Sequence, residues 1–172
     1  MSKKVKKNIW GLGIKIRKFL LYKILRKNTY GVRVIIRHSN EILLIRHHYD
    51  DFWTLPGGGI KKKENPQDAA IRESFEEVGI KIESKNLLKL LGKYNNFFGR
   101  KKDTVYVYVY RVENCDTSKN SSLKKSIKTG IEIEKANWFK FESLPKISLA
   151  TEKRILELIN DEYEVDQIRD WN

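Results

Sequence analysis

The chain has 172 residues, of which 33% are charged, 40% hydrophobic and 11% aromatic. This balance indicates one globular domain with a short appendage, and it excludes an intrinsically disordered, collagen-like or membrane-spanning protein. The single cysteine, Cys115, excludes an internal disulfide and a cysteine-rich zinc site. We therefore expect a reducing, cytoplasmic location.

The net charge of +13 is unevenly distributed along the chain. Residues 1–28 carry ten lysines and arginines and no acid, which gives +10, whereas residues 29–172 carry 35 − 10 = 25 basic and 22 acidic residues, which gives +3. We therefore divide the chain into a basic N-terminal segment (1–28) and a domain (29–172). Because the domain itself is nearly balanced, its charge does not favour nucleic acid as a partner.

The basic segment alternates apolar side chains with lysines over residues 9–27, which predicts an amphipathic helix from Ile14 to Lys27. Basic residues interrupt every apolar run, so we do not expect a transmembrane helix. The sequence leaves four alternative roles for this segment. It packs on the domain, contacts the inner membrane surface peripherally, contacts nucleic acid, or acts as an organelle presequence.

The domain begins with β-rich sequence and continues as a mixture of strands and helices. Runs of high β propensity predict strands over residues 30–37, 41–46, 87–91, 104–112 and 131–141. A glycine-rich turn, Gly57–Gly59, precedes a predicted helix over Pro66–Val78, and a last helix is predicted over 151–160. Residues 113–130 are polar and predict a long loop. This order of elements indicates the α+β class, with a mixed sheet between helices.

Three glutamates of the first predicted helix form the most informative pattern. Glu73, Glu76 and Glu77 are spaced i, i+3 and i+4, which places their carboxylates on one helix face within a single turn. Like charges at this distance repel, whereas a hard divalent cation would neutralise them, and oxygen ligands favour magnesium or manganese over zinc. Arg72 and Glu64 are placed to support the cluster.

This stretch resembles the Nudix box, G-x5-E-x7-R-E-U-x-E-E-x-G-U, in which U is a bulky aliphatic residue. The matching positions are Gly58, Glu64, Arg72, Glu73, Ser74, Glu76, Glu77, Gly79 and Ile80. The lead-in Trp53–Gly59 and the segment Glu132–Pro145 are also similar to the family, and the resemblance covers residues 30–160. It implies the Nudix fold, in which a mixed β-sheet lies between helices, with the N-terminal amphipathic helix as an addition.

One position departs from the family pattern, because Ser74 stands where an aliphatic residue is usual. The helix face opposite the glutamates carries Ile71, Phe75 and Val78, which we expect to pack into the core. We therefore expect Phe75 to fill the space that Ser74 leaves.

The resemblance implies roles for particular residues. Metal ligands would be Glu73, Glu76, Glu77 and the Gly57 carbonyl; the catalytic group would be Arg72, Glu76, Glu77 and Glu132; and supporting residues would be Gly58 and Glu64. Glu132 is the candidate general base outside the box, with Glu113 and Asp116 as alternatives. Arg46 and Phe97 are the candidate substrate-binding residues.

The implied activity is hydrolysis of a diphosphate linkage in a nucleoside diphosphate joined to another group, with Mg²⁺ as cofactor and Mn²⁺ as a substitute. The expected substrate is a small nucleotide or nucleotide-sugar, and residues 94–98 lack the proline that marks some ADP-ribose hydrolases. Two alternatives are an RNA 5′-pyrophosphohydrolase and a membrane-surface binding module with the Nudix fold. A homodimer is compatible with either.

Overall fold

The computed structural model describes residues 28–98, 101–112 and 127–171. Its helices and strands, in chain order, are β1 (Asn28–His38), β2 (Glu41–His47), α2 (Pro66–Val78), the short 3-10 turn η1 (Lys85–Leu87), β3 (Leu88–Phe98), β4 (Lys101–Arg111), β5 (Ile133–Lys140), the 3-10 turn η3 (Phe141–Ser143), α4 (Leu149–Ile159) and β6 (Glu164–Asp170). The predicted helix over 14–27 and the alternative acids Glu113 and Asp116 lie outside the described residues.

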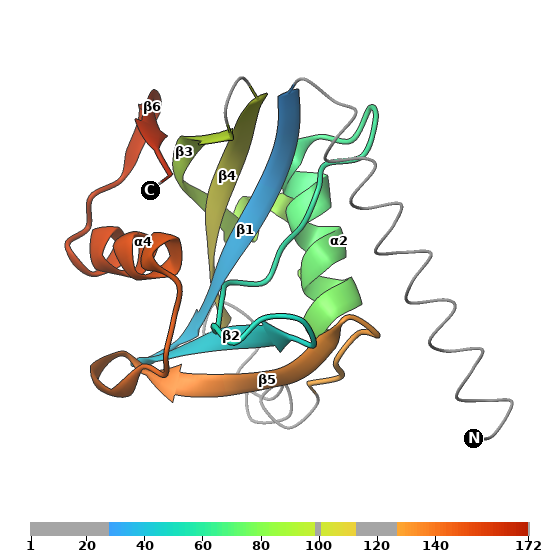
Figure 1. The fold of residues 1–172 in the computed structure, drawn as a ribbon, viewed down its shortest axis with the longest axis vertical. Helices are drawn as coiled ribbons and strands as arrows, with labels where there is room; N and C mark the ends of the chain where they lie inside the picture. Colours follow the sequence, from blue (N-terminus) through green and yellow to red (C-terminus); the bar gives the residue numbers. More distant parts are fainter. Residues whose placement is uncertain (1–27, 99–100, 113–126, 172) are drawn as a thin grey trace, which may run out of the picture.

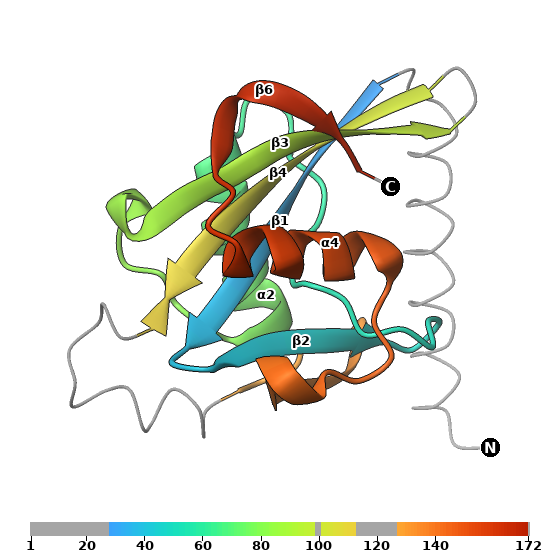
Figure 2. The same cartoon turned by 90° about the vertical axis from the view of Figure 1, so that its left-hand side faces the viewer.

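One mixed sheet organises the domain, with the strand order β5-β2-β1-β4-β3-β6. The pairs β1–β4 and β3–β6 are parallel, and the other neighbouring pairs are antiparallel. Helix α2 covers one face of the sheet and helix α4 covers the other (Figures 1 and 2). The predicted α+β class, with a mixed sheet between helices, is confirmed.

The alternation of side chains along β1 supplies both faces of the core. Val32, Val34 and Ile36 are buried against the α2 side, whereas Ile35 is buried against the α4 side. Because successive strand residues point to opposite faces, an apolar strand of this kind contributes to two cores at once. Arg33 lies between Val32 and Val34 and therefore points to the α4 side of the sheet.

A gap between β1 and β2 creates the space for a functional site. These two strands pair only at residues 36–38 with 41–43, and beyond that point they separate. The loop that leads to α2 fills the edge of β1 instead, since the Val32 and Val34 amides donate to the carbonyls of Gly58 (2.9 Å) and Pro56 (2.8 Å). The glycine turn is thereby fixed against the centre of the sheet.

Helix α2 has well-defined ends. The Asn65 side chain accepts from the amide of Asp68, Pro66 occupies the first turn, and Gly79 ends the helix in the left-handed conformation at φ 72°. These are the preferred residues for each position. The helix bounds agree with the prediction of Pro66–Val78.

The core-facing side of α2 differs from the prediction. Ser74 is fully buried and its hydroxyl donates to the Ala70 carbonyl at 2.8 Å, whereas Phe75 is 59% exposed. The expectation that Phe75 fills the core is therefore wrong. Ser74 occupies the inward position because its hydroxyl is satisfied within the helix, so its burial leaves no unpaired polar group.

Two further features exceed the prediction. Strand β3 continues to Phe98 instead of ending at residue 91, so Asn95, Asn96 and Phe97 lie in a strand. Strand β6 follows α4 and adds a parallel edge next to β3, with Tyr94 aligned to Arg169. The sequence of β6 is polar and has no apolar periodicity, so no strand was predicted there.

Candidate active site

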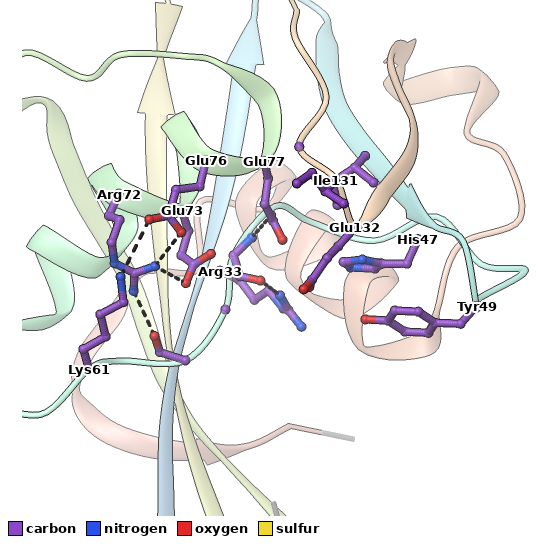
Figure 3. Close-up of a pocket in the computed structure, with 15 residues that line it drawn as sticks. Arg33, His47, Tyr49, Lys61, Arg72, Glu73, Glu76, Glu77, Ile131 and Glu132 are labelled. Atoms are coloured by element: carbon purple, nitrogen blue, oxygen red, sulfur yellow. Dashed lines mark hydrogen bonds and ion pairs between the residues drawn. The ribbon is translucent and has the colours of Figure 1, made fainter. Parts of the chain in front are cut away.

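A cavity of about 700 Å³ lies at the gap between β1 and β2. Its walls come from β1, the end of β2, the glycine turn, α2 and the turn before β5. The side chains labelled in Figure 3 that line it are Arg33, His47, Tyr49, Lys61, Arg72, Glu73, Glu76, Glu77, Ile131 and Glu132. All four of the catalytic residues that the sequence predicts, Arg72, Glu76, Glu77 and Glu132, therefore meet at one cavity, together with Glu73 and the glycine turn.

The glycines of the turn are required by close contacts. Gly57 has φ +140°, and a Cβ at this position would lie 2.2 Å from the Val32 carbonyl oxygen. A Cβ on Gly58 would lie 2.7 Å from the Glu73 carboxylate. Only glycine allows the backbone to approach both β1 and the carboxylates of α2 this closely.

Glu77 is the most deeply placed acid of the cavity. Its Oε2 accepts a hydrogen bond of 2.7 Å from the Gly57 amide. Burial raises the pKa of Glu77 to about 8, although Arg33 and the Gly57 amide oppose this shift. A buried carboxyl with a raised pKa is typical of functional sites, because the charged form is costly until a cation neutralises it.

Arg72 is the centre of the acidic network. Its guanidinium holds Glu64 with two bonds, from Nε at 2.8 Å and from Nη2 at 3.0 Å, and Nη2 also donates to the Gly59 carbonyl. Nη1 donates to Glu73 at 2.5 Å and to Glu76 at 3.1 Å. The two-bond contact with Arg72 lowers the pKa of Glu64, whereas burial raises the pKa of Glu73.

Two side chains define the open ends of the cavity. Glu76 is half-exposed, with Lys61 Nζ 3.7 Å from its Oε1. Glu132 is exposed and lies with His47 and Tyr49 across the cavity from Arg72, while Arg33 and Glu77 lie between the two groups (Figure 3).

Four further polar side chains of the cavity were not predicted from the sequence: Arg33, His47, Tyr49 and Lys61. Arg33 donates to the Gly57 carbonyl, the oxygen predicted to be a metal ligand. His47 is 91% buried, and burial together with Arg33 lowers its pKa. A charged residue in the otherwise apolar run VRVII was the signal that could have identified Arg33.

The two predicted substrate-binding residues lie elsewhere. Arg46 pairs with Glu134 at 3.0 Å and lies over the Trp53 ring, because residue 46 points to the opposite side of β2 from His47. Phe97 is 60% exposed on β3 and does not line the cavity. Neither assignment is retained.

The donors at the cavity fit a hard divalent cation. Carboxylates and a backbone carbonyl form an all-oxygen set, which suits Mg²⁺ or Mn²⁺. Within the described residues, no three histidine, cysteine or acidic side chains converge closely enough to hold an ion as they stand. In the structure Arg72 donates to Glu73 and Glu76, and Arg33 donates to the Gly57 carbonyl.

Comparison with known proteins places this site in a family. The family model for the NUDIX domain matches residues 27–159. Diphosphoinositol polyphosphate phosphohydrolase 3-beta of Bos taurus is 38% identical over 110 residues, which are 63% of this chain and 60% of that protein. The chain thus spans less than two thirds of the curated relatives it matches.

Solved structures share the fold at lower identity. A MutT Nudix hydrolase from Burkholderia pseudomallei has a TM-score of 0.62 and 22% identity, covering 77% of this chain and 99% of that one. An Ap4A hydrolase from C. elegans has a TM-score of 0.59 and 20% identity, covering 78% and 97%. The chain belongs to the Nudix hydrolase family. In the described part of the chain, no helix combines the length and apolar character needed to cross a bilayer.

Proposed function

We propose that the protein hydrolyses a diphosphate linkage in a nucleoside diphosphate joined to another group, with Mg²⁺ as cofactor and Mn²⁺ as a substitute, in the cytoplasm. The observation that carries this proposal is the meeting of Glu73, Glu76 and Glu77 with the Gly57 carbonyl and Glu132 at one cavity. A binding module would not need the complete acidic set.

In this proposal the oxygens of Glu73, Glu76, Glu77 and Gly57 hold the cation. The bound ion would neutralise diphosphate oxygens and lower the pKa of a water. Arg72 and Glu64 position the ligands, because one guanidinium fixes Glu64, Glu73 and the Gly59 carbonyl at once.

Glu132 is the proposed general base. Its carboxylate lies across the cavity from Glu73 and Glu76, so a diphosphate between them would face acids on both sides (Figure 3). Glu132 is an exposed carboxylate at the open side of the cavity, where it is able to accept a proton from the attacking water. Arg33 lies between the two groups, where its guanidinium is able to contact phosphate oxygens.

The test is a hydrolysis screen of nucleotides, nucleotide-sugars, dinucleoside polyphosphates, diphosphoinositol polyphosphates and triphosphorylated RNA, with Mg²⁺ or Mn²⁺. Glu76→Gln should abolish the turnover, whereas Glu134→Gln is the matched control because Glu134 lies on β5 outside the cavity. Absence of turnover with every compound, for a folded and metal-bound protein, would favour the binding-module alternative.

A second substrate class has its own support. The relatives that match at 37–38% identity are named diphosphoinositol polyphosphate phosphohydrolases. Lys61, Lys62 and Lys63 are exposed beside the cavity, and Lys61 lines it, which favours a densely charged anion.

The RNA alternative depends on residues 1–28, so removing that segment should weaken turnover of RNA and spare a free nucleotide. Peripheral membrane contact through residues 9–27 and a homodimer stay predictions.

A further inference from the structure

A second cavity of about 280 Å³ adjoins the site, and Arg33, His47 and Tyr49 line both. We propose that this second cavity binds the nucleoside half of the substrate, with Trp171 as a specificity-determining residue. The proposal rests on the hydrolase function proposed above and adds the place where the group next to the diphosphate binds.

The C-terminal segment that supplies Trp171 lies beyond the part of the chain that the family model matches. Strand β6 adds to the sheet next to β3, and the Trp171 amide then donates to the Asn95 carbonyl at 2.8 Å. The buried Arg154 donates to the Trp171 carbonyl at 3.3 Å, and its guanidinium lies 5.4 Å from the indole centroid. These contacts fix Trp171 as a wall of the second cavity.

Tyr49 provides a second aromatic wall. One face of its ring is stacked on His47, with centroids 5.0 Å apart and an interplanar angle of 16°. The side chain is nevertheless 62% exposed, which leaves the other face accessible. Two amphipathic aromatic side chains at one cavity are typical of sites that bind a flat ring carrying polar groups.

The charges of the second cavity favour an uncharged group over a further phosphate. Of its described lining residues, Arg33 is already bonded to the Gly57 carbonyl, and burial lowers the pKa of His47. Asp50 contributes a negative charge, and the hydroxyls of Thr54 and Thr151 line the same space. Hydroxyls and one carboxylate suit the hydrogen-bonding groups of a ribose or a base, and they would disfavour a phosphate-dense ring.

The geometry therefore divides the substrate between the two cavities. The diphosphate lies with the glutamates in the larger cavity, and Arg33 separates it from the nucleoside in the smaller one. A nucleoside monophosphate spans that boundary with its single phosphate, so it is a suitable probe that requires no turnover.

Calorimetric titration of the full chain with AMP, ribose 5-phosphate and inorganic phosphate, in Mg²⁺, tests the proposal. We expect AMP to bind at least tenfold more tightly than either of the other two. Trp171→Ala should weaken the binding of AMP about tenfold, which is near the lower end of the effect of one stacking contact. The affinity for inorganic phosphate should stay unchanged. Trp171→Phe should restore most of the affinity, and Trp138→Phe, on β5 and outside the second cavity, should change nothing.

A second variant tests the proposal even if Trp171→Ala does not fold. Tyr49→Ala removes an exposed ring, so its unfolding midpoint should match wild type while AMP binding weakens several-fold. Equal binding of AMP and ribose 5-phosphate, or AMP affinity unchanged in both alanine variants, would overturn the proposal. Turnover of a nucleotide substrate with unaltered KM in both variants would also overturn it, and would leave the hydrolase function standing. Conversely, AMP binding with the expected losses but no turnover would count against the hydrolase function alone.

Discussion

Glu77→Gln should stabilise the metal-free protein, and the gain should grow as pH rises. The Glu77 carboxyl of the folded protein has its pKa raised from 4.5 to about 8, mainly by burial. The folded state therefore binds this proton more tightly than the unfolded state between these values. Stability from this group is fully present below pH 4.5 and is lost as pH rises toward 8.

The linkage relation gives the size of the effect. Each pH unit inside this window removes at most about 1.4 kcal/mol of unfolding free energy. Water entry and side-chain movement reduce the penalty for a buried charge, so we expect a loss of about 2 kcal/mol between pH 5 and pH 8. Glutamine has nearly the same shape as glutamate, does not titrate, and keeps an oxygen to accept from the Gly57 amide.

Urea denaturation in EDTA at pH 5, 6, 7 and 8 measures the difference. The wild-type curve should fall with pH relative to Glu77→Gln, whereas Glu134→Gln should follow wild type because Glu134 is a surface acid. Saturating Mg²⁺ should raise the wild-type midpoint more at pH 8 than at pH 6, and should not raise that of Glu77→Gln. Parallel curves for wild type and Glu77→Gln in EDTA would refute the assignment of a buried, proton-binding carboxyl.

Three further changes test other parts of the site and its support. Gly58→Ala should reduce turnover at least tenfold with little change in the unfolding midpoint, since its Cβ would lie 2.7 Å from Glu73 and displace that carboxylate; normal turnover would contradict this close approach. Arg72→Lys should lower kcat by about tenfold or more and weaken Mn²⁺ binding measured by electron paramagnetic resonance, because an ammonium cannot replace the two-bond contact with Glu64. Tyr94→Phe should cost about 1–3 kcal/mol in urea denaturation, because its hydroxyl donates to Glu157 at 2.5 Å and accepts from Arg169 at 2.6 Å in a buried network; a midpoint equal to wild type would show that this network contributes little.

The helix that carries the acids was predictable because its signals are local. Asn65, Pro66 and Gly79 mark its ends, and the spacing of the glutamates follows from the helical period. The orientation of Ser74 and Phe75 was not predictable from hydrophobicity, since a serine whose hydroxyl bonds within the helix is as easily buried as an alanine. A prediction from size and polarity alone therefore placed Phe75 in the core and Ser74 outside it, the reverse of what the structure shows.

Arg33 and Trp171 were not predicted, and the reason is a different one. Arg33 and Glu77 are 44 positions apart, and they meet only because β1 separates from β2 and the glycine turn fills the gap. Trp171 reaches the second cavity through a polar edge strand without apolar periodicity. Such non-local contacts depend on strand order, which a single sequence does not specify.

The charges of the larger cavity explain why its acids are compatible with a stable fold before any cation binds. Its described lining carries four carboxylates, Glu73, Glu76, Glu77 and Glu132, against Arg33, Lys61 and Arg72, a formal charge of 3 − 4 = −1. One divalent cation would change this to +1, which favours an anionic diphosphate where the empty cavity disfavours it. A proton held by Glu77 would bring the formal charge from −1 to 0 without the metal, so the raised pKa of that carboxyl and the demand for a cation are two consequences of one buried negative charge.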